Sequence, residues 1–161
     1  MSIKKFIYKL FSIKVVHAHC DVPCGIYDPI SAKIAAQTVL KMAIRMEAVE
    51  LPPKDISTPN SMARYIAVKE EHAQIVKNEL NILWSDYFKP EHLEKYPDLH
   101  THFWNAMKAA SKVRQEINKA AAEDLLASVK EISKIFWDTK GVKTVENDSH
   151  QTGGGSLIYT A

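Results

Sequence analysis

The stretch "DPISAKIAAQTVLKMAIRMEAV", residues 28–49, decides the fold class of this chain of 161 residues. Asp28 is a residue type that caps helices, and Pro29 suits the first helical turn. Apolar residues then recur three and four positions apart, at Ala32, Ala35, Val39, Met42, Met46 and Val49. This spacing predicts a helix with one apolar face for packing against other helices. The prolines of the following "LPPKD" end it, because proline cannot continue a helix.

Three further helical segments follow, over roughly residues 61–87, 97–111 and 116–139. The second helix has a ridge of residues four apart, at Val68, His72, Val76, Leu80 and Trp84. Few strand signals compete before residue 140. The pattern therefore predicts an all-α fold, a four-helix bundle with short connections.

The bulk composition is that of one ordinary globular domain. Hydrophobic residues make up 46% of the chain and charged residues 25%, which is enough to build a sizeable core without disulfides. The net charge of +2 is too small to indicate a nucleic-acid partner. No apolar run is long enough to cross a membrane, so we expect no membrane partner and a cytoplasmic protein.

The two ends of the chain differ from its middle. The first eighteen residues, "MSIKKFIYKLFSIKVVHA", carry four lysines and no acid. Val16 and Ala18 fit the cleavage site of a secretory signal, but Lys9 and Lys14 interrupt its apolar stretch. We favour a removable pro-segment over residues 1–18. At the other end, residues 141–161 are predicted to be a flexible tail, whose last "SLIYTA" is apolar enough to dock as a short strand.

Both cysteines lie in "HCDVPCGIYDP", residues 19–29. Cys20 and Cys24 could form a tight disulfide, a redox couple one residue wider than the thioredoxin spacing, or a metal site. A cut after Ala18 would give His19 a free α-amine. Amine, amide and two thiolates would then form a square that suits Ni(II) or Cu(II), with the imidazole as an axial ligand. Metal loading should weaken as pH falls, because protons compete for the ligands.

The same stretch resembles the hook of the nickel superoxide dismutase family, whose pattern is His-Cys-Asp-x-Pro-Cys-Gly-x-Tyr-Asp-Pro. Two further blocks resemble that family, "LWSDYFKPEHLEKYPDLH" at residues 83–100 and "KIFWDTK" at residues 134–140. The resemblance covers residues 19–140. It implies a nickel hook carried on a four-helix bundle.

The resemblance also implies the chemistry. Superoxide would be converted to oxygen and hydrogen peroxide by Ni(II)/Ni(III) cycling, with one nickel ion per subunit of a homohexamer. A processing peptidase would cut between Ala18 and His19. The implied nickel ligands are the amine and imidazole of His19, the amide nitrogen and thiolate of Cys20, and the thiolate of Cys24.

Other site residues follow from the same resemblance. Tyr27 matches the tyrosine that gates the metal, with Asp21 beside the hook, and Tyr87 matches the tyrosine that pairs with the gate. Lys89 is our candidate for attracting the superoxide anion. We expect Trp84 to be a core or interface aromatic residue.

Two positions depart from the family pattern. Well-known members support the axial histidine with a glutamate and an arginine, at positions that are Ala35 and His72 here. His72 either replaces the arginine as a partner or is a satisfied core histidine. The other histidines lack metal spacing and are expected at the surface or an interface, namely His92, His100, His102 and His150.

Two alternatives remain at this stage. A non-catalytic nickel-binding protein would need the cut before His19 but would not turn over superoxide. A thiol oxidoreductase using Cys20 and Cys24 would work without the cut and without metal.

Overall fold

The computed structural model describes residues 24–161 and is mostly helical, as the sequence predicts. No helix in this part of the chain is both long and apolar enough to cross a membrane. The helices are α2 (Ile30–Glu47), α3 (Ser57–Ile82), α4 (Pro90–Lys95), α5 (Leu99–Gln115) and α6 (Lys119–Thr139), and a π-helical turn, η1 (Leu83–Tyr87), continues α3.

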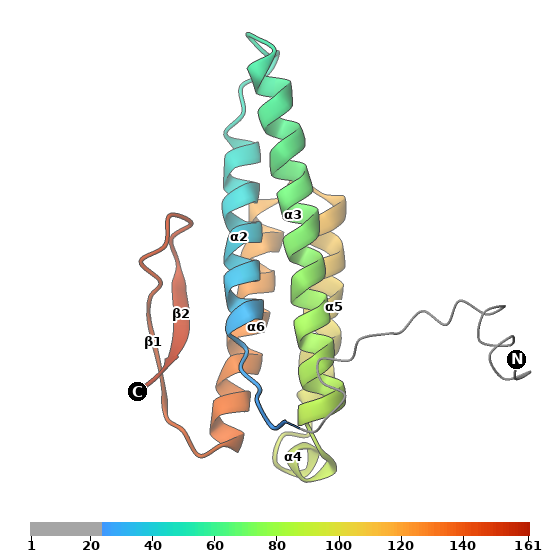
Figure 1. Ribbon diagram of the computed structural model, residues 1–161, viewed down its shortest axis with the longest axis vertical. Coiled ribbons are helices and arrows are strands. Elements are labelled where there is room, and N and C mark those ends of the chain that lie inside the picture. Colours follow the sequence, from blue (N-terminus) through green and yellow to red (C-terminus); the bar gives the residue numbers. More distant parts are fainter. Residues whose placement is uncertain (1–23) are drawn as a thin grey trace, which may run out of the picture.

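The long helices α2, α3, α5 and α6 run side by side (Figure 1). Helix α2 packs against α3 and α6, and α5 packs against the same two helices from the other side. The apolar ridges predicted from the sequence supply the core, because residues such as Val39, Val76 and Leu125 are completely buried. The shared core holds the four helices together, and so positions the loops at their ends.

Several helix boundaries differ by a few residues from those expected. Helix α3 begins at Ser57 rather than Ser61, because the Asp55 carboxylate accepts hydrogen bonds from the backbone N–H groups of Ser57 at 2.9 Å and Thr58 at 3.1 Å. Proline at position 59 is tolerated there, since a residue in the first turn needs no helical hydrogen bond. The proline-containing break after Tyr87 also holds the short helix α4, which begins at Pro90.

The sequence predicts a flexible tail over residues 141–161 whose last residues dock as a short strand. That strand is confirmed as β2 (Ser156–Thr160), but in place of a flexible tail it pairs with β1 (Thr144–Asp148) in a β-hairpin beside α2 and α6 (Figure 1). Its Leu157 and Ile158 are buried. Three α2 side chains, each one turn after the last, donate hydrogen bonds to hairpin carbonyls: Lys33 to Ile158 (2.8 Å), Gln37 to Gly154 (3.2 Å) and Lys41 to Thr152 (2.6 Å). From sequence alone these three polar residues look like a solvated helix face.

Helix α6 holds the hairpin by an ionic contact. The Lys130 ammonium lies 2.6 Å from the Glu146 carboxylate, which also accepts a hydrogen bond from the Ser156 hydroxyl. These two hydrogen bonds lower the pKa of Glu146 from 4.5 to about 2. A carboxyl group with a lowered pKa in the folded state stabilises that state once it is ionised.

This contact predicts an acid-sensitive hairpin. The stabilisation by Glu146 is fully present above its unfolded pKa near 4.5 and is lost as pH falls towards its folded pKa of about 2. Amide hydrogen exchange in β1 and β2 should therefore accelerate over that range beyond the intrinsic pH effect. Glu146→Gln should loosen the hairpin at pH 6 and remove the extra pH dependence. The exposed Glu123→Gln serves as the control, and an unchanged pH response in Glu146→Gln would contradict the assignment.

Candidate functional site

Of the predicted metal ligands, only Cys24 belongs to the described part of the chain. His19, Cys20 and Asp21 lie outside the described residues, so their roles stay predictions. Cys24 is exposed, and the backbone N–H of Ile26 points at its sulfur from 3.5 Å. Gly25 between them has φ of 69°, a left-handed conformation that favours glycine.

The segment after Cys24 is anchored to the start of α2. The Asp28 carboxylate accepts a hydrogen bond of 2.8 Å from the backbone N–H of Ile30, and Pro29 is fully buried. Asp28 therefore satisfies an N–H group at the start of α2 that has no partner within the helix. This anchor fixes the place of Tyr27, which directly precedes Asp28.

Tyr27 meets Tyr87 across the end of the helical core. Their ring centroids are 5.6 Å apart and the rings are inclined at 56°. Tyr87 is the last residue of η1, where the backbone N–H of Phe88 bonds the carbonyl of Leu83 at 3.0 Å. Such π-turns are rare and often occur at functional sites. The structure thus brings together the two tyrosines that the sequence singled out.

Tyr87 is held by a chain of hydrogen bonds. The Thr139 hydroxyl donates to the carbonyl of Phe136 at 2.6 Å, and the Tyr87 hydroxyl lies 2.6 Å from the same Thr139 oxygen. Because Thr139 has a single hydroxyl proton, Tyr87 must be the donor to it. The Phe136 ring packs 4.6 Å from the Tyr87 ring, and the Lys140 ammonium lies 5.2 Å over the Tyr87 ring. The end of α6 therefore determines how Tyr87 is oriented.

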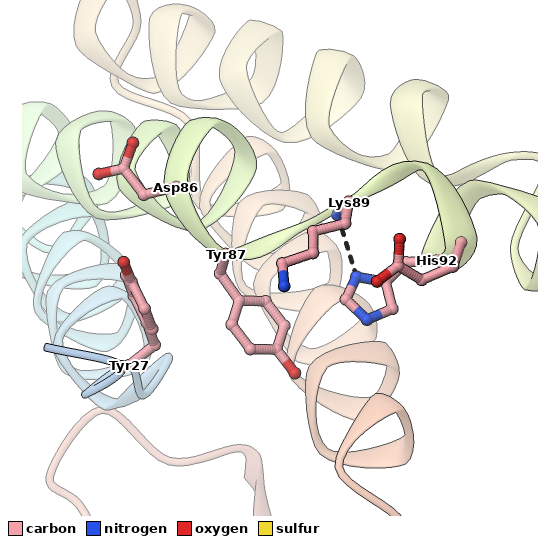
Figure 2. Close-up of a pocket in the computed structure, with 7 residues that line it drawn as sticks. Tyr27, Asp86, Tyr87, Lys89 and His92 are labelled. Atoms are coloured by element: carbon pink, nitrogen blue, oxygen red, sulfur yellow. Dashed lines mark hydrogen bonds between the residues drawn. The ribbon is translucent and has the colours of Figure 1, made fainter. Parts of the chain in front are cut away.

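A pocket of about 400 Å³ opens beside these tyrosines. Figure 2 shows how its side chains surround the space, with Tyr27 facing Asp86 and Tyr87 facing Lys89. Gly25 forms part of the wall, so the pocket adjoins Cys24. Its lining is Gly25, Tyr27, Asp86, Tyr87, Lys89, Glu91 and His92. Two carboxylates and one ammonium line the pocket, which is therefore not strongly positive.

His92 is a pocket residue that the sequence interpretation assigned to the surface or an interface. The backbone N–H of Lys89 donates to its Nδ1 at 3.1 Å (Figure 2). Its ring stacks on the Tyr87 ring, with centroids 5.5 Å apart and an angle of 14°. The sequence carried one sign of this contact. His92 lies three residues after Lys89, the residue before α4, and a side chain at that spacing can accept a hydrogen bond from the backbone N–H of the capping residue.

Ala35 and His72, the departures from the family pattern, lie on the packed helices α2 and α3. Ala35 is only 2% exposed. The Nδ1 of His72 lies 2.9 Å from the carbonyl of Val68 one turn earlier, which requires the proton on Nδ1. One nitrogen of His72 is thus satisfied within its own helix.

Trp84 and His150 lie in different surroundings, at the core and at the surface. Trp84 packs against the core, with its ring centroid 5.1 Å from that of Phe103 and 5.5 Å from that of His100. His150 is exposed at the hairpin loop. Within residues 24–161, no three His, Cys, Asp or Glu side chains group closely enough to hold a metal ion. A metal at Cys24 would therefore need ligands from outside the described residues.

The comparisons with known proteins agree on one family. Residues 14–140 match the family described as nickel-containing superoxide dismutase. The chain is 42% identical to "Superoxide dismutase [Ni]" of Streptomyces seoulensis over 133 residues, which are 82% of this chain and 96% of that protein. It is 41% identical to the protein of the same name from Streptomyces coelicolor over the same shares.

Solved structures give the same result. A native nickel superoxide dismutase aligns with a TM-score of 0.67 and 38% identity, over 76% of this chain and 99% of that one. A nickel-containing superoxide dismutase with its nickel ligation in the oxidised state aligns with a TM-score of 0.67 and 41% identity over the same shares. The hairpin lies beyond the residues that match the family. The chain belongs to the nickel-containing superoxide dismutase family.

Proposed function

We propose that this protein is a superoxide dismutase that uses nickel, made as a precursor and activated by cleavage between Ala18 and His19. The observation that carries the proposal is the Tyr27–Tyr87 pair beside Cys24, in a chain of the nickel-containing family. The overall reaction converts two superoxide anions and two protons to oxygen and hydrogen peroxide.

The proposed nickel ligands are the amine and imidazole of His19, the amide nitrogen and thiolate of Cys20, and the thiolate of Cys24. When bound, nickel supplies a one-electron Ni(II)/Ni(III) couple. The donor set fits that task, because thiolate and deprotonated amide donate charge and stabilise the higher oxidation state. Cys24 is exposed and directly precedes Gly25, which lines the pocket.

Tyr27 and Tyr87 have the proposed role of restricting access to the thiolates. Thiolates oxidise readily, and the product of this reaction is a peroxide. The pocket beside these rings, of about 400 Å³, has room for superoxide and water. Asp21 is proposed to lie beside the hook. His72 is proposed to act through Nε2, since its Nδ1 bonds the Val68 carbonyl.

Lys89 is the proposed cation for superoxide. It lines the pocket together with the carboxylates of Asp86 and Glu91, so a single charge change there alters the local field strongly. The Lys140 ammonium over the Tyr87 ring adds a second positive charge nearby. Local lysines rather than the net charge of the protein would thus attract the anion.

The proposed organisation follows the same reasoning. Residues 1–18 would be the pro-segment that a peptidase removes, and residues 19–140 the hook and its four-helix bundle, followed by the tail at 141–161. We propose assembly as a homohexamer in the cytoplasm, where thiols stay reduced before nickel arrives.

The first test compares two purified forms, one starting at Met1 and one at His19, each with and without nickel. Superoxide disproportionation should occur only in the nickel-loaded His19 form, because only that form has the amine ligand. Equal activity in both loaded forms would contradict the amine ligation. One nickel ion per chain in the His19 form without any turnover would instead identify a nickel-binding protein.

A second test addresses Lys89. At low ionic strength Lys89→Glu should lower kcat/KM by about tenfold or more, and the loss should shrink as salt screens the charges. Lys112→Glu makes the same charge change near the far end of α5 and should have little effect. A Lys89→Glu rate equal to that of Lys112→Glu at low salt would remove Lys89 from the mechanism.

A further inference from the structure

The C-terminal hairpin is linked to both segments that position the tyrosine pair. Its first strand begins at Thr144, a short turn after Thr139 and Lys140, which contact Tyr87. Its second strand returns to Lys33 in the first turns of α2, close to the segment that carries Tyr27. We propose that the hairpin is a clamp that positions the Tyr27–Tyr87 pair, with Lys33 as its main positioning residue. This inference rests on the proposed dismutase function.

Lys33 is an unusual residue for its place. It is 7% exposed, near the helix start, where the helix dipole disfavours a positive charge. Burial lowers the pKa of the Lys33 ammonium, and the nearby Asp28 charge raises it. The contacts that compensate for burial are the 2.8 Å bond to the Ile158 carbonyl and the Tyr159 ring 5.7 Å away. Lys33 thus couples the buried strand β2 to the anchor of Tyr27.

The other end of the clamp is the turn after α6. The backbone N–H groups of Lys140 and Val142 bond the Trp137 carbonyl at 3.1 and 3.0 Å, and that of Gly141 bonds the Asp138 carbonyl at 3.0 Å. These bonds lead the chain from Thr139 straight into β1. Pairing of β1 with β2 then fixes this turn relative to α2, since Ala161 N–H also bonds the Lys143 carbonyl at 2.9 Å.

The hairpin is separable from the fold it clamps. A solved relative aligns over 99% of its own length with only 76% of this chain. The family match ends at residue 140, before the hairpin begins. Their helices therefore form without a counterpart of this hairpin. The hairpin is an addition by which this chain restrains the end of α6 and the start of α2 together.

The test compares two lysines that make the same kind of bond to the hairpin. Lys33→Met leaves the buried Ile158 carbonyl without its donor, near the tyrosines. Lys41→Met removes the bond to Thr152, at the hairpin tip. Both variants are made in the nickel-loaded chain starting at His19. Amide hydrogen exchange and the rate of cysteine oxidation by added peroxide, followed by mass spectrometry, are measured in each.

The clamp predicts a non-local effect for Lys33→Met. The rate of amide hydrogen exchange should rise by about tenfold at the first turn of α2, because a hydrogen bond from a charged donor is lost. It should rise by a similar factor at residues 140–142, which Lys33 does not touch. Cysteine oxidation should accelerate by a similar factor. Lys41→Met should raise exchange only around residues 149–155. A chain ending at residue 143 should fold and reproduce the Lys33→Met pattern.

Two results would overturn the clamp. In the first, Lys33→Met raises amide hydrogen exchange only at Lys33 and Ile158 and leaves the rate of cysteine oxidation unchanged. In the second, Lys41→Met raises exchange at the first turn of α2 and at residues 140–142 as much as Lys33→Met does. Failure of the proposed function is distinguishable, because the exchange pattern does not depend on turnover. An inactive wild-type protein with the predicted exchange pattern would keep the clamp and reject the dismutase.

Discussion

The hydrogen bond between the Tyr87 and Thr139 hydroxyls, at 2.6 Å, is the contact on which the candidate site depends. It joins the π-turn after α3 to the last turn of α6, two elements that come from distant parts of the sequence. Once Tyr87 is fixed, its ring sets the positions of Tyr27 on one side and His92 on another. The pocket beside Cys24 is the space that these rings and the adjoining charged side chains leave between them.

The sequence predicted the helices because their apolar ridges are long and regular. It also predicted that Tyr27 and Tyr87 belong to the site, although only through the family resemblance. The short helix α4 was missed because prolines mark breaks and helix starts alike. The last strand was predicted from the apolar "SLIYTA", but β1 and its pairing with that strand were missed. The hairpin docks through Lys33, Gln37 and Lys41, whose side chains bond backbone carbonyls far along the chain. Periodicity within a helix carries no signal for such partners.

The position of His92 and the charges around the site were also not predictable from periodicity. His92 lines the pocket because of a bond from the Lys89 backbone, which no spacing of metal ligands would reveal. Lysines elsewhere serve the fold, as when buried Lys69 donates to the carbonyls of Arg114 at 3.0 Å and Glu116 at 2.9 Å at the end of α5. The net charge of the chain therefore says little about the electric field at the site, where Lys89 lines the pocket together with two carboxylates.

We propose that nickel is held by the thiolates of Cys20 and Cys24, with Cys24 next to a residue of the tyrosine pocket. This ligation can be measured by nickel K-edge X-ray absorption of the loaded chain starting at His19. We expect two sulfur ligands together with nitrogen ligands, and one sulfur ligand fewer in Cys24→Ser. A spectrum with only nitrogen and oxygen ligands, or one that Cys24→Ser leaves unchanged, would contradict it.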